Sequence, residues 1–510
     1  MKPNSKKKIV TNLAPFILGL ATSFSLPPYN FLIINFIIFP FLILLIIENI
    51  QKSKLTVFKI GWFYGFGYFF SSLYWITNAL TFEEIFKPLI PIALIIIPLF
   101  LGLFYGFAIL IFSFFKLEKN LFTILLFSLI FSVVEFIRGS ILGGFPWNLI
   151  VYSWTEYINS LQILSLVGTY SFNLISITIF SLPLIISSNQ SFRFKFILIF
   201  FTIFILLLNH IYGSLIIKKN NKNFHELDYK IKIVSPKIEI SRYFEYDNEK
   251  EIIKELIELS NPSNFENTIF IFPEGALAGV NFDQLKSFKN LFLNNFSSNH
   301  IIIMGINTEK NSSTYNSMVV LNNELKLLSQ YNKIKLVPFG EFLPFENILK
   351  KLGFRKISFG YESFSKGKDR KLLSIESNKF SFIPLICYEI IYSGNIKKEL
   401  YETSFIINIS EDGWFGNSIG PHQHFSHGIF RSIEEGKNVI RSTNNGISAF
   451  IDVNGRVVSR LESTQRGVIE INKYKKFNET LFSKFGNKIF FYIIIIYIGV
   501  IFFIKRRELK

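Results

Sequence analysis

A cysteine, a glutamate and a lysine with the potential for joint chemistry stand next to apolar runs of the sequence. Cys387, the only cysteine, follows the run Phe382–Ile386, and Glu274 follows Thr268–Phe272. Such runs are typical of buried strands, whose ends deliver side chains to a pocket. A thiol needs a base to become a thiolate and a cation to stabilise the tetrahedral oxyanion. Glu274 is a candidate base, and Lys333 is a candidate cation.

Each of these residues alone also has a purely structural interpretation. A free cysteine is often a small core residue. A glutamate after a strand, or the pair Lys333 and Lys335, is commonly solvated. The order of the three residues within one region favours nucleophilic catalysis over three separate structural roles.

Composition predicts a membrane protein with one large polar domain. Half of the 510 residues are hydrophobic, 61 are Phe, only 18% are charged, and the mean hydropathy is positive. This exceeds what a soluble protein normally carries. Eight apolar stretches are long enough to cross a bilayer, at 9–26, 31–49, 58–79, 88–115, 120–141, 160–187, 196–214 and 488–504.

Basic residues predict the orientation of these spans. Lys and Arg gather on alternate connections, at 6–8, 52–59, 116–119, 193–195 and 505–507. The positive-inside rule then puts both termini in the cytoplasm and the long polar segment outside. The net charge of +17 is interpreted as topology determinants and as affinity for anionic lipid. The sequence lacks the basic stripe interleaved with aromatic residues that is typical of nucleic-acid binding.

The polar segment, at about 228–475, has the pattern of an α/β fold. Short β-branched runs alternate with amphipathic stretches, which predicts an α/β sandwich. The expected strands are 231–234, 268–272, 300–305, 317–321, 382–386, 405–409, 439–442, 448–452 and 468–471. The expected helices lie near 247–260, 281–296 and 422–437.

The fifth expected span contains ionisable residues. Glu135 and Arg138 are three residues apart, so they share one face of a helix and are able to pair. Charges inside spans are often functional, but a buried structural pair is an equally good interpretation. Trp147 follows in a turn, where it suits the headgroup level of the outer face.

Three motifs, Pro-Glu at 273–274, Tyr-x-Lys-x-x-Leu at 331–336 and Cys-Tyr-Glu at 387–389, resemble those of the carbon-nitrogen hydrolase (nitrilase) superfamily, in which Glu, Lys and Cys stand at strand ends in this order. Beyond the triad motifs, the chain resembles the apolipoprotein N-acyltransferase family over nearly its whole length. The residues that carry this likeness are 336–344, 386–389, 412–416, 420–424, 441–446 and 135–148. The resemblance implies a nitrilase-like αββα sandwich inserted in an eight-helix transmembrane bundle. The implied parts are a seven-span bundle at 1–215, a catalytic domain at 228–475 and a C-terminal span at 486–506.

By this resemblance the enzyme transfers an acyl chain from a membrane phospholipid to the N-terminal amine of diacylglyceryl-cysteine in apolipoproteins. A ping-pong reaction through a thioester on Cys387 is implied, with Glu274 as base and Lys333 as oxyanion cation. Also implied are location in the bacterial inner (cytoplasmic) membrane, a periplasmic catalytic domain, a monomer and no cofactor. The family's supporting pocket residues correspond to Glu341, Tyr388, Glu389, Trp414 and Phe415.

Some positions depart from the family pattern, and other interpretations stay open. Glu411 stands where an amide is common in the family. Gly275, directly after the candidate base Glu274, is a loose fit to a position that is usually small or hydroxylic. The spacing of His422, His424 and His427 fits no common metal signature, so we expect packing or hydrogen bonding there. The alternatives are a membrane-anchored amidase acting on small amides, and a transporter or scaffold that only binds.

Overall fold

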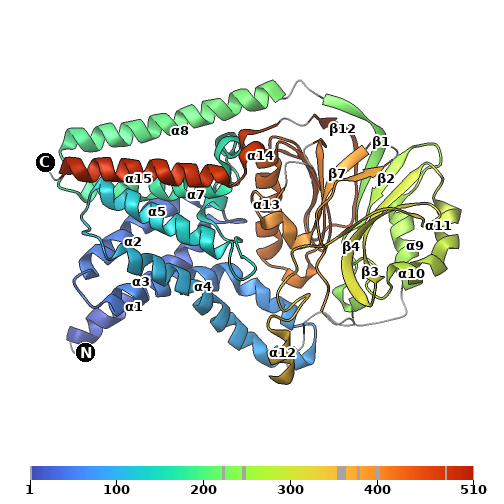
Figure 1. Ribbon diagram of the computed structural model, residues 1–510, viewed down its shortest axis with the longest axis horizontal. Coiled ribbons are helices and arrows are strands. Elements are labelled where there is room, and N and C mark those ends of the chain that lie inside the picture. The colour runs from blue at the N-terminus through green and yellow to red at the C-terminus, as the bar shows by residue number, and fades with distance from the viewer. Residues whose placement is uncertain are drawn as a thin grey trace. The chain divides into compact units, whose positions relative to one another are not determined.

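The computed structural model divides the chain into two compact units. One comprises 1–77, 87–217 and 481–510, and the other 78–86 and 218–480. The structure describes residues 3–220, 224–243, 249–352, 356, 363–375, 380–396, 402–476 and 479–508. Figure 1 shows the helices and strands of both units.

The first unit is helical. Its main helices are α1 (Pro3–Thr22), α2 (Asn35–Asn49), α3 (Lys54–Leu73), α4 (Ile90–Phe112), α5 (Leu121–Arg138), α7 (Leu164–Ser181), α8 (Phe192–Asn220) and α15 (Lys488–Glu508). Two short helices, α6 (Ile158–Leu161) and α14 (Leu481–Phe485), also belong to it. The chain is therefore a multi-pass membrane protein, since several of these helices are long and apolar enough to cross a bilayer.

Among the described residues, six helical stretches meet that standard rather than the expected eight. They are 32–49, 84–112, 121–138, 164–187, 192–220 and 488–507. The other two expected spans fall on α1 and α3. Within the first, Leu13–Ser25 forms a shorter apolar helix, and α3 is rich in Gly, Ser and Tyr, which lowers its apolar content.

The glycines of α3 explain its place among the other helices. A Cβ at Gly61 would lie 2.3 Å from the carbonyl oxygen of Tyr105 on α4, and one at Gly67 would lie 2.1 Å from that of Phe16 on α1. Small residues of this kind let helix backbones approach closely in membranes. In α3, small residues that allow close helix packing therefore stand where a lipid-facing span would have large apolar side chains.

The second unit is an α/β sandwich of two six-stranded sheets. One has the order β12-β1-β2-β3-β4-β5 and the other β11-β10-β9-β8-β7-β6. The first comprises β12 (Gly467–Lys475), β1 (Phe224–Ser235), β2 (Thr268–Ile271), β3 (His300–Lys310), β4 (Ser313–Asn322) and β5 (Leu327–Asn332). The second comprises β11 (Val457–Leu461), β10 (Ser448–Ile451), β9 (Asn438–Asn444), β8 (Phe405–Glu411), β7 (Phe380–Ile386) and β6 (Leu373–Ile375). Strands β1, β2 and β3 are parallel, as are β7, β8 and β9, so the carboxyl ends of each set meet at one edge.

Helices cover the outer faces of both sheets (Figure 1). They are α9 (Glu249–Ser260), α10 (Phe282–Leu285) and α11 (Lys289–Asn295) on the first sheet, and α13 (Gly420–Glu435) on the second, while α12 (Glu346–Leu349) lies in the connection after β5. The three expected helical regions are confirmed, the middle one as two short helices joined by a turn of 3-10 helix. Apolar side chains of α9, such as Ile253 and Leu256, pack with Phe270 of β2 in the core.

Glu435, the last residue of α13, is a buried acid with a predictable effect on stability. Burial, and then the neighbouring Glu434, raise the pKa of Glu435 from 4.5 to about 8. The folded state keeps a proton that the unfolded chain releases, so the free energy of unfolding falls as pH rises from about 4.5 to about 8. Glu435→Gln should raise the melting temperature by about 2–4 °C near pH 7.5 and leave it unchanged near pH 4.5. Glu258→Gln, on the exposed face of α9, is the matched control, and a gain at both pH values would contradict the argument.

Candidate active site

Cys387 occupies a sharp turn between β7 and a short 3-10 helix, Cys387–Ile391. Its φ angle is 50°, in the left-handed region that costs a residue with a side chain about 1–2 kcal/mol. Backbone strain of this kind gathers at functional sites. The turn is stabilised by Asn408 of β8, whose amide donates to the carbonyl oxygens of Leu385 and Cys387, each at 3.2 Å.

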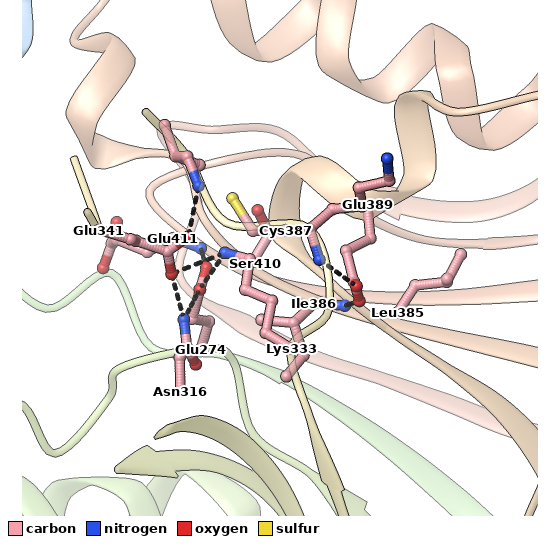
Figure 2. A network of polar contacts seen from close by, with 12 residues as sticks. Glu274, Asn316, Lys333, Glu341, Leu385, Ile386, Cys387, Glu389, Ser410 and Glu411 are labelled. Atoms are coloured by element: carbon pink, nitrogen blue, oxygen red, sulfur yellow. Dashed lines mark hydrogen bonds and ion pairs between the residues drawn. The ribbon is translucent and has the colours of Figure 1, made fainter. Parts of the chain in front are cut away.

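Glu274 follows β2, and its carboxylate is fully engaged (Figure 2). Oε1 accepts from Nζ of Lys333 at 3.1 Å and from the amide of Asn316 at 2.7 Å. Oε2 accepts from the backbone N–H of Glu411 at 3.0 Å. Gly305 of β3 permits this packing, because a Cβ there would lie 2.6 Å from Cα of Glu274. The acid is therefore held in one orientation.

Lys333 directly follows β5 and lies between two carboxylates. Its Nζ is 3.1 Å from Oε1 of Glu274 and 3.0 Å from Oε1 of Glu341, and the residue is 1% exposed. Asn316 donates to both of these oxygens, at 2.7 Å each. The second oxygen of Glu341 accepts from the backbone N–H of Val337 at 2.8 Å. These contacts join the two glutamates, Lys333 and Asn316 in one network (Figure 2).

Burial and charge set the protonation states of the thiol and the amine. Burial, and then the negative charge of Glu274, raise the pKa of Cys387 well above its ordinary value. Burial alone would lower the pKa of Lys333, but Glu274 and Glu341 outweigh it and hold that pKa well above its usual range. The resting site thus contains a thiol and an ammonium group, so the thiol needs a base before it can attack.

Glu389 differs from Glu274 and Glu341 in its contacts, because its carboxylate mainly binds backbone N–H groups. Its carboxylate accepts from the backbone N–H groups of Ile334 and Lys335, at 3.0 and 3.1 Å, and from that of Ile386 at 2.9 Å. Tyr331 donates to both carboxylate oxygens, at 2.7 and 2.9 Å, and Arg370 lies 3.1 Å away. Glu389 therefore connects the segment after Lys333 to the strand that delivers Cys387.

The aromatic residues expected near the site lie on two elements. The hydroxyl groups of Tyr388 and Tyr392 form a hydrogen bond, and burial raises the pKa of Tyr388 to about 12. Trp414 lies in the turn after β8, with its ring centroid 5.1 Å from that of Tyr243 and 5.6 Å from that of Phe82.

The turn after β8 also carries Phe415, whose carbonyl oxygen accepts from the amide of Asn78 at 2.6 Å. Residues 78–86, between α3 and α4 in the sequence, belong to the same compact unit as this turn. Trp414 and Phe415 are thus contacted both by residues 78–86 and by Tyr243, which are far apart in the sequence.

Glu135, Arg138 and Trp147 lie in the helical unit. Glu135 and Arg138 form a fully buried ion pair. Tyr105 donates to Glu135, and Arg138 donates to the carbonyl oxygen of Phe145. Trp147 is 2% exposed and packs on Trp75, with ring centroids 4.9 Å apart. The ion pair therefore holds the loop after α5 through the hydrogen bond from Arg138 to Phe145.

Two residues that hold the acids of the site had no signal in the sequence. Asn316 lies in the polar half of β4, and Arg370, which contacts Glu389, lies in the connection between β5 and β6. His424 contacts Asp412, with Nδ1 2.9 Å from Oδ1, which confirms the expected hydrogen bonding for that histidine. In the part of the chain that the structure describes, no group of three or more His, Cys, Asp or Glu side chains could hold a metal ion.

The two units match two family models. Residues 18–182 match the apolipoprotein N-acyltransferase N-terminal domain, and residues 260–472 match carbon-nitrogen hydrolase. A CN-hydrolase superfamily structure from Xanthomonas campestris is 13% identical, with a TM-score of 0.34 over 49% of this chain and 91% of that one. The match of residues 260–472 and the strand order show that the second unit is a nitrilase-like two-sheet α/β domain and that the chain is an enzyme of the nitrilase superfamily.

Full-length relatives narrow this class to one family. The chain is 33% identical over 449 residues to the apolipoprotein N-acyltransferase of Rickettsia prowazekii, covering 86% of this chain and 88% of that one. It is 29% identical over 477 residues to that of Brucella melitensis, covering 90% and 88%. The chain belongs to the apolipoprotein N-acyltransferase family, as the sequence motifs predicted.

Proposed function

We propose that this protein transfers an acyl chain from a membrane phospholipid to the N-terminal amine of diacylglyceryl-cysteine in apolipoproteins. The observation that carries the proposal is the full-length family match, on a chain that combines apolar helices with a nitrilase-like unit. Both substrates carry acyl chains, so membrane helices suit this reaction better than the release of ammonia from a small soluble amide.

In the first half-reaction Cys387 is the nucleophile. Glu274 takes the thiol proton, and the thiolate attacks an ester carbonyl carbon of the phospholipid. Lys333, an ammonium group fixed between two carboxylates, stabilises the tetrahedral oxyanion. The C–O bond breaks, Glu274 returns the proton to the leaving oxygen, and a lysophospholipid departs from a thioester on Cys387.

In the second half-reaction the α-amine of the lipidated cysteine attacks the thioester carbonyl. Glu274 accepts a proton from the attacking nitrogen, the C–S bond breaks, and an amide forms. The thiolate that leaves recovers a proton from Glu274. The fixed orientation of Glu274, with acceptor contacts on both oxygens, supports its use in both half-reactions.

The finer organisation belongs to the same proposal. We place the seven-span bundle at 1–215, the catalytic domain at 228–475 and the last span at 486–506, with eight spans in total. The basic connections support cytoplasmic termini and a periplasmic catalytic domain in the inner membrane of a bacterium. Glu341 and Glu389 support the pocket through Lys333 and Cys387, and the enzyme acts as a monomer.

Trapping of the acyl-enzyme tests the proposal directly. Incubation of the purified full chain with phosphatidylethanolamine or phosphatidylglycerol in detergent micelles, without acceptor, should add one acyl mass to Cys387 and release lysophospholipid. Intact-protein mass spectrometry measures the adduct, and addition of a diacylated lipopeptide should discharge it. Hydroxylamine, which cleaves thioesters, is the chemical control.

The same experiment separates the alternatives. Release of ammonia from a small amide, with no adduct from either phospholipid, would favour an amidase and reject the proposal. Slow alkylation of Cys387 near neutral pH does not indicate a protein that only binds, because the raised pKa of the thiol predicts slow labelling in the active enzyme too.

A further inference from the structure

A buried ion pair lies beside the base but outside the triad. Arg242 and Glu411 are 6% and 1% exposed, and the guanidinium donates to Oε2 of Glu411. The carboxylate also accepts from the amide of Asn444 at 2.7 Å and from the backbone N–H of Gly413 at 2.8 Å. Burial raises the pKa of Glu411 above its ordinary value, whereas Arg242 and the other partners, which are all donors, favour the carboxylate form.

The pair joins the two flanks of Glu274. Nε of Arg242 donates to the carbonyl oxygen of Gly275 at 3.1 Å, directly after the base. The backbone N–H of Glu411 donates to Oε2 of Glu274 at 3.0 Å. One ion pair therefore holds Gly275, the residue after Glu274, and the residue whose N–H orients the carboxylate of Glu274.

The same pair also holds the turn that carries Trp414. Glu411 accepts the N–H of Gly413 at the start of this turn. The guanidinium of Arg242 lies 4.7 Å from the ring centroid of Tyr243, and that ring lies 5.1 Å from the ring of Trp414. Gly275 has a φ of 59°, and a Cβ there would lie 1.8 Å from the hydroxyl of Tyr243, so only glycine fits beside this aromatic group.

We propose that Arg242 and Glu411 are positioning residues, whose buried ion pair holds Glu274 and the Trp414 turn in one fixed arrangement. The inference rests on the proposed function, because it assigns Glu274 as the base. The titratable groups that surround Glu274 are Lys333, Glu341, Cys387 and Tyr243, together with the pair itself. The net charge of the pair is zero, so loss of either member changes the charge beside the base as well as its position.

The test compares single variants in the full chain by the rate of acyl-enzyme formation on phosphatidylethanolamine micelles. Glu411→Gln leaves the positive charge of Arg242 uncompensated beside the base. A positive charge favours the deprotonated carboxylate, so the acid limb of the pH–rate profile should move to lower pH. Arg242→Met leaves the negative charge, so that limb should move to higher pH, each by about 0.5–1 unit. Both rates should fall about 10- to 100-fold, as expected for residues that orient a reacting group.

A charge-conserving variant separates position from charge and guards against misfolding. Arg242→Lys keeps the cation but loses the planar fork, so its acid limb should stay at the wild-type pH while its rate falls. The matched control is the exposed pair Arg466 and Glu255, 2.9 Å apart, where Arg466→Met and Glu255→Gln should change neither quantity.

The outcomes decide between the inference and the proposed function. Acid limbs that stay in place, or move in the same direction in both single variants, would overturn the positioning role. A double variant, Arg242→Met with Glu411→Gln, that forms the acyl-enzyme at the wild-type rate would also overturn it. Failure of the wild-type chain to form any acyl-enzyme would instead reject the proposed function.

Discussion

Replacement of Cys387 by alanine is expected to lower N-acylation by about 10⁴-fold or more, because it removes the nucleophile while every other group stays in place. Alanine matches the small size of cysteine and tolerates the left-handed φ of 50° no worse, so the melting temperature should change little. Cys387→Ser keeps a hydroxyl but should lose nearly as much activity. The hydroxyl proton is far less acidic than that of a thiol, so little of the nucleophilic alkoxide forms.

The measurement is acyl transfer to a diacylated lipopeptide, with mass spectrometry of the enzyme in parallel. Because Cys387 is the only cysteine, a variant that lacks it offers no other thiol to carry the adduct. In the wild type, alkylation by iodoacetamide should quicken as pH rises, since burial and Glu274 raise the pKa of the thiol. A Cys387→Ala protein that keeps more than about one hundredth of the wild-type rate would contradict the nucleophile assignment.

Sequence patterns located the centre of each sheet but not most of its edges. All nine expected strands are confirmed, and they include every parallel strand of the sandwich. The strands that the pattern did not predict are β5, β6 and β11, and each lies at an edge of its sheet. Edge strands meet water on one side, so β5 and β11 lack the continuous apolar run that central parallel strands require.

Sequence motifs identified the residues of the proposed triad, whereas the groups that orient them could be found only in the structure. Glu274 and Cys387 each follow a strand that is visible as an apolar run, whereas Lys333 follows β5, which has no such run and was located by its motif. The partners of Glu274 are Asn316, 42 residues away, and the backbone of Glu411, 137 residues away. No local pattern encodes contacts at such separations, because the first depends on the strand order within one sheet and the second on how the two sheets pack.

For the membrane part, six of the eight expected spans are confirmed as long, apolar helices among the described residues. Hydropathy identifies helices that face lipid, such as α8, whose spanning window is not buried in its unit. It identifies α3 poorly, since this helix carries glycines for contacts with its neighbours. The same chemistry that brings helices together thus weakens the signal of a span.

The choice of Lys333 over Lys335 as the catalytic cation leads to a second large effect. Lys333→Met should lower acyl-enzyme formation by about 10²–10³-fold, the loss expected when one oxyanion donor is removed. It should also destabilise the fold by about 3–5 kcal/mol, because Glu274 and Glu341 would share a buried site without their counter-ion. Lys335→Met is the matched control, since Lys335 is half-buried and its Nζ lies 4.9 Å from the ring centroid of Tyr392.

A second substitution separates the chemical role of Lys333 from its structural role. Lys333→Met with Glu341→Gln removes one positive and one negative charge, so the melting temperature should return to within a few degrees of the wild type. Activity should stay low, because no cation faces the developing oxyanion. Recovery of activity in the double variant would mean that Lys333 only neutralises the two acids. An equal loss in Lys335→Met would instead show that the wrong lysine has been assigned, since the two side chains leave the same segment two residues apart in different surroundings.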